Sequence, residues 1–78
     1  MKKEELLNIV QEIFRDIFDD ESLIIDLTTN SSDIDDWDSL NHINLVVAIE
    51  KEIEIKFNFE ELSLMKNVGE MLDLILKK

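Results

Sequence analysis

The segment from residue 36 to residue 50 decides the fold, and it reads Asp-Trp-Asp-Ser-Leu-Asn-His-Ile-Asn-Leu-Val-Val-Ala-Ile-Glu. Asp38 stands at the apparent start of a helix, where its side chain can cap free backbone N–H groups. Ser39 follows in the first turn, beside N–H groups that lack partners and favour an anion. Two interpretations of Ser39 remain from these residues alone: a hydroxyl suited to carry a phosphate ester, or a residue merely tolerated after the Asp38 cap.

The helix that begins at Asp38 or Ser39 is predicted to run to about Glu52 or Ile53. Apolar residues cover much of its girth, and we expect it to be the most buried element of the molecule. Its apolar positions are Leu40, Ile43, Leu45, Val46, Val47 and Ile49.

Three further segments have helical patterns. The first helix is predicted from about Lys3 to Phe18, because apolar residues recur there at three- and four-residue spacing. A short helical turn is expected after Asn58. The last helix starts at Asn67, a good cap, with Glu70 placed to complete a capping box. Gly69 in its first turn costs some helix propensity.

The remaining segments are predicted to be irregular. Residues 19–37 have no sustained period and form a long loop, which apolar residues pin onto the core: Leu23, Ile24, Ile25, Leu27 and Ile34. Residues 53–57 alternate in polarity but have no partner strand, so we expect an extended connector. The predicted fold is therefore all-α, a small four-helix bundle of three main helices and one short helix, formed by a single domain over residues 1–78.

Composition restricts the function. The chain has 78 residues, no cysteine and a formal net charge of −11. Disulfides and thiolate metal sites are therefore excluded. The negative charge argues against binding nucleic acid and favours partners with basic surfaces. No segment has the pattern of a signal peptide or a membrane span, so we expect a soluble, cytoplasmic monomer.

Catalysis and specific metal binding are not expected. Ser39 and His42 share a helix face, but a Ser–His hydrolase needs a third orienting group, an oxyanion hole and a pocket, for which this chain has little room. His42 is expected to face solvent. The acidic run from Asp33 to Asp38 fails the EF-hand pattern, because Trp37, Asp38 and Asn44 stand where that loop needs an oxygen ligand, glycine and glutamate.

An Asp38-Ser39-Leu40 motif at a helix start, after a long loop in a small acidic helical chain, resembles the acyl carrier protein family. The apolar run that closes in Glu50-Lys51-Glu52-Ile53 is similar to the family's second helix. The segment Ile55-Lys56-Phe57 resembles its next connector, and residues 66–76 its last helix. The resemblance covers essentially the whole chain.

This resemblance implies a non-enzymatic carrier. Ser39, flanked by the motif residues Asp38 and Leu40, would bear covalent 4′-phosphopantetheine attached by a phosphopantetheinyl transferase. The cofactor thiol would hold acyl groups as thioesters for ligases, ketosynthases or acyltransferases with basic docking surfaces. The core would open to shelter the acyl chain, and its soft or branched residues are Val46, Val47, Met65, Met71 and Ile75.

Several residues depart from the family pattern. Asn41 and Asn44 are neutral where carriers of bulk fatty-acid synthesis have acids, and Asp36 replaces a glycine. Trp37 replaces a small or aliphatic residue; it either packs the loop onto the bundle or meets a partner at the surface. Glu50 and Glu52 remain for basic partners. We therefore expect a specialised carrier for secondary-metabolite, cell-surface or modified-lipid synthesis.

Two alternatives stay open at this point. A peptidyl or aminoacyl carrier would have the same fold and prosthetic group with an amino-acid cargo. An unmodified acidic helical docking module would explain the charge and the helices, but would leave the position of Asp38-Ser39-Leu40 to chance.

Overall fold

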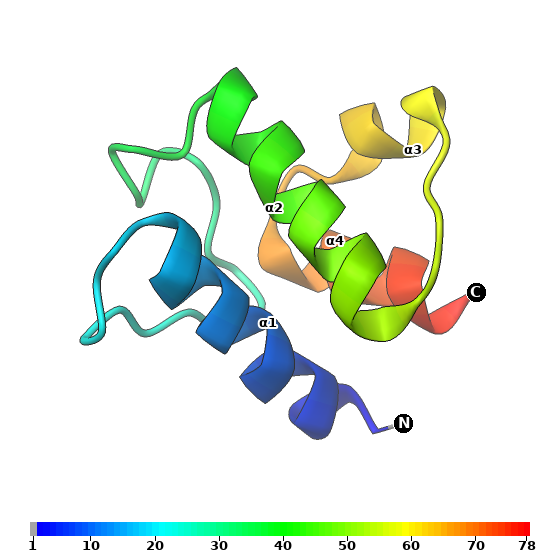
Figure 1. The fold of residues 1–78 in the computed structure, drawn as a ribbon, viewed down its shortest axis with the longest axis horizontal. Helices are drawn as coiled ribbons and strands as arrows, with labels where there is room; N and C mark the ends of the chain where they lie inside the picture. Colours follow the sequence, from blue (N-terminus) through cyan, green and yellow to red (C-terminus); the bar gives the residue numbers. More distant parts are fainter. Residues whose placement is uncertain (1) are drawn as a thin grey trace.

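The computed structural model describes residues 2–78 and confirms the all-α fold. Its helices are α1 (Lys3–Ile17), α2 (Ser39–Ile53), α3 (Phe59–Leu64) and α4 (Val68–Leu76), and they appear in that order along the chain in Figure 1. Within the described residues, the only β pairing is an isolated bridge between Asn30 and Asn67. The predicted helix ends agree with the structure to within about one residue, which is the usual uncertainty of such boundaries.

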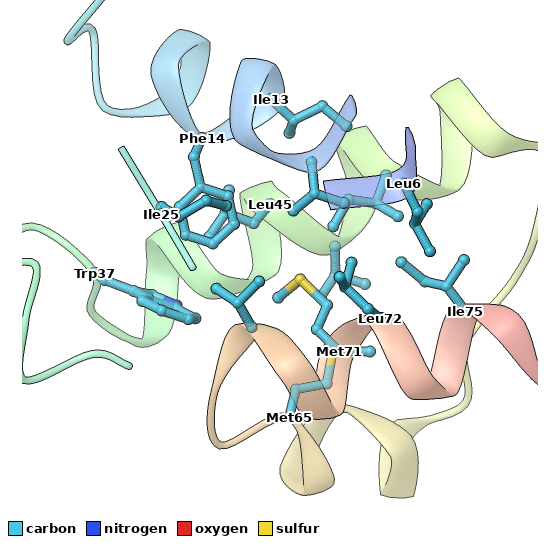
Figure 2. Packing of buried hydrophobic residues seen from close by; sticks show 14 residues of the cluster. Leu6, Ile13, Phe14, Ile25, Trp37, Leu45, Met65, Met71, Leu72 and Ile75 are labelled. Atoms are coloured by element: carbon cyan, nitrogen blue, oxygen red, sulfur yellow. The ribbon is translucent and has the colours of Figure 1, made fainter. Parts of the chain in front are cut away.

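The hydrophobic core lies between α1, α2 and α4, and the long loop adds Ile25 and Trp37 to it. Figure 2 shows Met71 of α4 reaching into the centre of this cluster, with Phe14 of α1 above the Trp37 side. Helix α3 packs against α4 but contributes no buried residue. The residues whose side chains are fully buried are Leu6, Val10, Phe14, Leu45, Ile49, Val68, Met71 and Leu72.

The expectation that α2 is the most buried element is wrong. Leu40 is 68% exposed, Ile43 52% and Val47 42%, whereas only Leu45, Val46 and Ile49 are buried. Helix α1, by comparison, buries four residues. The physical reason is that α2 packs on α1 and the core along one side, while the short α3 leaves its other side uncovered.

The long loop is held to α1 by polar contacts as well as by apolar packing. Arg15 Nε donates to the Leu23 carbonyl at 2.7 Å, and Gln11 Oε1 accepts from the backbone N–H of Ile25 at 3.0 Å. Of the five apolar loop residues, Ile24 and Leu27 are exposed and do not pin the loop as predicted. The loop is therefore anchored by the buried Ile25 and Trp37, by Leu23 and Ile34, which pack against the core as predicted, and by these side-chain hydrogen bonds.

The loop also caps the start of α4. The Thr29 carbonyl accepts from Val68 N at 2.9 Å, and the Leu27 carbonyl accepts from Gly69 N at 2.8 Å. These bonds satisfy N–H groups that a helix start otherwise leaves free. A Cβ on Gly69 would lie 2.8 Å from the Leu27 carbonyl oxygen, so the close approach of the loop requires glycine.

Asn67 caps α4 as predicted, but the capping box does not form there. The Asn67 side chain accepts from Glu70 N at 2.8 Å, while Glu70 Oε2 accepts from Lys66 N instead of Asn67 N. A reciprocal capping box occurs at α3, between Asn58 and Glu61. Among residues 2–78, no helix combines the length and the apolar character needed to cross a membrane.

Candidate functional site

Ser39 is the first residue of α2 and its side chain is exposed. Asp38 is the N-cap, and its Oδ1 accepts from Asn41 N at 2.9 Å. In the described part of the chain, the backbone N–H groups of Ser39 and Leu40 make no hydrogen bond. An anion attached to the Ser39 hydroxyl would therefore lie beside free N–H donors at the positive end of the helix dipole.

A cavity of about 430 Å³ opens beside Ser39. Asp38, Ser39 and His42 line it from the start of α2, and Ser31 and Trp37 line it from the long loop. Its opposite wall comes from the end of α3 and the link to α4, namely Leu62, Met65 and Lys66. The volume lies within the range of small-ligand sites, about 300–1,000 Å³.

Trp37 and His42 form a hydrogen-bonded bridge between the loop, α2 and α3. Trp37 Nε1 lies 3.1 Å from His42 Nδ1, and His42 Nε2 lies 3.2 Å from the Leu62 carbonyl oxygen. The indole nitrogen can only donate, so His42 Nδ1 accepts. The proton of the neutral imidazole is then on Nε2, which donates to Leu62. The two rings also stack, with centroids 6.0 Å apart.

The bridge corrects two expectations. His42 does not simply face solvent, because both ring nitrogens are engaged. Trp37 is 5% exposed, so it is not a surface aromatic for partner docking and packs the loop onto the bundle instead. Its indole meets the Phe14 ring edge-to-face at 5.1 Å between centroids. Trp37 precedes the helix and is five residues from His42, which is not a helical contact spacing, so the sequence pattern held no signal for this contact.

The hydrogen bonds of Asn41 and Asn44 explain why these positions hold amides and not carboxylates. Asn41 Nδ2 donates to the Asp36 carbonyl at 2.7 Å, and Asn44 Nδ2 lies 3.3 Å from Asn41 Oδ1. A carboxylate at either position has no hydrogen to donate, so it would face another oxygen without a bond. The amide of Asn41 thus holds the loop against the helix that begins with Ser39.

The residues expected to dock partners differ in their availability. Glu52 is exposed, whereas Glu50 is half-buried and its Oε2 accepts from Phe57 N at 2.8 Å, which ties the connector to α2. Sequence reasoning missed the exposed apolar residues of α2, which are Leu40, Ile43 and Val47. The signal was available, since a helix apolar over so much of its surface cannot bury all of it in so small a domain.

The residues expected to shelter an acyl chain are mostly core residues. Val46, Met65, Met71 and Ile75 are buried. Val47 is exposed, so its inclusion among these core residues was wrong. Met65 alone of the five lines the cavity beside Ser39. Val46, Met71 and Ile75 belong to the packed core between the helices, and Figure 2 shows Met71 and Ile75 within it.

One acid and one base lie near the site. Glu61, on α3, has a carboxyl whose pKa is lowered by the Lys78 ammonium, 2.6 Å from its Oε1, and by the backbone N–H of Asn58. Lys66 is the one cationic residue that lines the cavity. No cluster of three or more His, Asp or Glu side chains within residues 2–78 is arranged to hold a metal ion.

Comparisons with known proteins agree with this geometry. The family model described as phosphopantetheine attachment site matches residues 4–75. The chain is also similar to the solution structure of a holo acyl carrier protein from Geobacter metallireducens, with 47% identity and a TM-score of 0.86. That match covers 92% of this chain and 83% of the other. A search of curated proteins found no significant match.

Proposed function

The chain belongs to the acyl carrier protein family, a non-enzymatic family that carries covalent 4′-phosphopantetheine, and we propose that Ser39 is the residue that bears this group. The family, the fold and the cofactor that were expected from the resemblance are thereby confirmed. The interpretation as an unmodified docking module is set aside by the family membership.

The observation that carries the assignment is the setting of Ser39. Its side chain is exposed at the first position of α2, two free N–H groups stand beside it, and a cavity of about 430 Å³ adjoins it. These features fit a phosphodiester at a helix start and leave room for a flexible arm. The cap formed by Asp38 fixes the helix start and hence the direction in which Ser39 is presented.

The chain itself does not activate the serine. Both nitrogens of His42, the histidine that lines the same cavity as Ser39, pair with Trp37 and Leu62. A separate phosphopantetheinyl transferase must therefore activate the hydroxyl of Ser39. When bound, the cofactor contributes a thiol that holds the acyl group for partner enzymes.

The exposed side of α2 is the surface that we assign to partners. Leu40, Ile43 and Val47 form an apolar strip next to Ser39. Glu52 is an exposed carboxylate in the last turn, but at about 100° per residue it lies on a different side of the helix from this strip. Partners of matching chemistry are a phosphopantetheinyl transferase and acyl ligases, ketosynthases or acyltransferases with apolar, basic surfaces. The net charge of −11 favours their encounter over that of nucleic acid.

The amides of Asn41 and Asn44 favour a dedicated partner over the enzymes of bulk fatty-acid synthesis. They place no carboxylate on this part of α2, so a partner selected for two acids there would lose two ion pairs. The pathway that we propose is therefore specialised lipid, cell-surface or secondary-metabolite synthesis.

Intact-mass measurement tests the attachment residue. The chain is co-expressed with a broad-specificity phosphopantetheinyl transferase, as wild type, Ser39→Ala and the control Ser63→Ala, which alters another exposed helical serine. Wild type and Ser63→Ala should gain phosphopantetheine, and Ser39→Ala should not. Modification of Ser39→Ala would move the site elsewhere, and an unmodified wild type would contradict the assignment.

Restoring one acid tests the choice of partner. Asn44→Glu removes a single weak contact at 3.3 Å and adds a carboxylate to α2. Loading by bulk fatty-acid enzymes should then improve. No improvement would show that the missing acid does not narrow the choice of partner. Asn41→Asp is the less clean variant, because it also breaks the bond to the Asp36 carbonyl.

A further inference from the structure

The contact between Trp37 and His42 depends on the protonation state of the imidazole. The indole nitrogen can only donate, so the contact at 3.1 Å needs a lone pair on His42 Nδ1, which the ring offers only while it is neutral. On the other side of the ring, Nε2 lies 3.2 Å from the Leu62 carbonyl oxygen and can donate to it in either charge state. Protonation therefore removes the contact to the loop and keeps the contact to α3.

Trp37 has no second acceptor at this place. It is 5% exposed, and its Nε1 makes no other hydrogen bond within residues 2–78. In the same part of the chain, every buried side-chain nitrogen and oxygen has a partner, so loss of the contact would create the first unpaired one. Phe14 closes off the core side, since its ring packs edge-to-face on the indole at 5.1 Å between centroids. An indole that moves to reach water therefore takes the loop with it.

The charged groups around His42 do not pair with it. Asp38 and Lys66 line the same cavity and place one carboxylate and one ammonium group there. On α3, the Glu61 carboxylate is held by Lys78 at 2.6 Å. Over residues 2–78, no carboxylate forms an ion pair with His42. The partners of the ring are therefore the indole and a carbonyl, both of them uncharged.

The indole does not replace the lost contact by attracting a cation. Its Nε1–H is at the edge of the ring, where the aromatic quadrupole is positive. The centroids of the two rings are 6.0 Å apart, which is the outer limit of a cation–π contact. The loop acids beside Trp37, which are Asp35 and Asp36, are exposed, and α1 faces the indole with Phe14. The contacts around the ring are thus those of a neutral imidazole.

We propose that the Trp37–His42 contact is a pH-sensitive switch, which holds the long loop on α2 while the imidazole is neutral and releases it when the imidazole is protonated. Histidine is the side chain that ordinarily changes charge between about pH 5 and pH 8. Trp37 immediately precedes the Asp38 cap, so its release loosens the segment that leads to Ser39. Acid should therefore slow the modification of Ser39, and this consequence rests on the proposed function.

Nuclear magnetic resonance of the apo protein between about pH 8 and pH 5 tests the switch. At the upper end, a scalar coupling should be observed across the hydrogen bond from Trp37 Nε1 to His42 Nδ1. The coupling should vanish with the midpoint at which the ring protons of His42 titrate, and the backbone amides of Asp38 and Ser39 should shift with the same midpoint. A coupling that persists after His42 has titrated, or a His42 that does not titrate in this range, would overturn the switch.

His42→Asn is the matched control. Its amide oxygen takes the place of Nδ1 as acceptor and does not titrate, so the amides of Asp38 and Ser39 should not shift in this pH range. If His42→Asn does not fold, Trp37→Phe removes the Nε1 donor and keeps an aromatic ring. The amides of Asp38 and Ser39 should then no longer follow the titration of His42, and amides that still follow it would contradict release through Trp37.

The rate of phosphopantetheine attachment tests the consequence for Ser39. The kcat/KM of one transferase is measured with wild type and with His42→Asn at each pH, and the ratio of the two cancels the pH dependence of the enzyme. The ratio should fall by about two- to tenfold as His42 becomes protonated, which is the factor that one net hydrogen bond corresponds to. A constant ratio would show that the switch does not reach Ser39. A wild type that is modified at no pH would contradict the proposed function, whereas the coupling in the apo protein would still decide on the switch.

Discussion

Trp37 and His42 are the single tryptophan and the single histidine of the chain, and each gives the other its role. The indole donates to the imidazole, and this contact sets the tautomer that lets His42 donate to α3. Because Trp37 immediately precedes the Asp38 cap, the bridge also fixes the loop that leads to Ser39. One pair of side chains therefore positions three segments around the site.

A double-mutant cycle measures this bridge. Trp37→Phe should destabilise the fold because it leaves His42 Nδ1 without its donor, and His42→Ala should do so because it frees both partners. The coupling between the two changes should be about 1 kcal/mol, the usual net worth of a hydrogen bond. Urea unfolding of the wild type, both single variants and the double variant gives this value. Additive effects would show that the contact contributes nothing to stability.

Gly69→Ala distinguishes two opposite effects at one residue. Helix propensity alone predicts that alanine stabilises α4 by about 1 kcal/mol. The structure predicts the reverse, because the new Cβ would lie 2.8 Å from the Leu27 carbonyl oxygen, which is backbone. We expect a loss of about 1–3 kcal/mol, as for other overpacked sites. The sign of the change in the free energy of unfolding, measured in urea, decides between the two.

At the scale of elements, the sequence predicted where helices lie better than what they bury. The period of α1 identified its buried stripe, since Leu6, Val10, Ile13 and Phe14 recur at helical spacing. On α2 the same reasoning failed. Apolar residues occur on several sides of this helix, so their spacing does not show which side faces the core. Which side is covered depends on α3, and a six-residue helix without a buried side chain covers little.

Two isoleucines on α2 test this division of the helix. Ile49 is fully buried and Ile43 is 52% exposed, so the same substitution samples both sides. Ile49→Ala should cost about 2–5 kcal/mol in unfolding free energy. Ile43→Ala should cost less than about 0.5 kcal/mol, yet lower kcat/KM of the transferase, because Ile43 belongs to the proposed partner surface. Equal destabilisation by both variants, or an unchanged transferase rate in Ile43→Ala, would contradict this picture.

At the scale of the whole molecule, the sequence predicted the fold class and the position of the candidate serine. It did not predict the contacts that join distant segments. The bonds from Val68 and Gly69 to the loop carbonyls join residues about 40 apart in the chain, and neither period nor propensity reports such pairs. The cavity beside Ser39 was missed for the same reason, since its walls come from the loop, α2 and the α3–α4 link.

Acid acts on this molecule in two opposite directions. With 19 acidic residues and a net charge of −11, protonation relieves repulsion and favours the folded state. Protonation also removes hydrogen bonds that the charged carboxylates accept. The pKa of the Asp26 carboxyl is below its ordinary value of 3.8, because the hydroxyl and the backbone N–H of Thr28 donate hydrogen bonds to it. Thr29 adds a smaller effect in the same direction. Asp26 orders the turn whose carbonyls cap α4.

The Asp26 contribution can be isolated from the general repulsion. A carboxyl with a lowered pKa in the folded state stabilises the fold above its ordinary pKa, and this stabilisation is lost as pH falls through the lowered value. The difference in melting temperature between wild type and Asp26→Asn should therefore be largest near neutral pH and should shrink below about pH 4. Measurements in about 0.5 M salt screen the repulsion between distant carboxylates but leave these short bonds intact. In a Thr28→Val background, which lacks the hydroxyl donor, the same difference should be smaller at neutral pH. A difference that stays constant down to pH values well below 3.8 would show that the charge of Asp26 does not stabilise the turn.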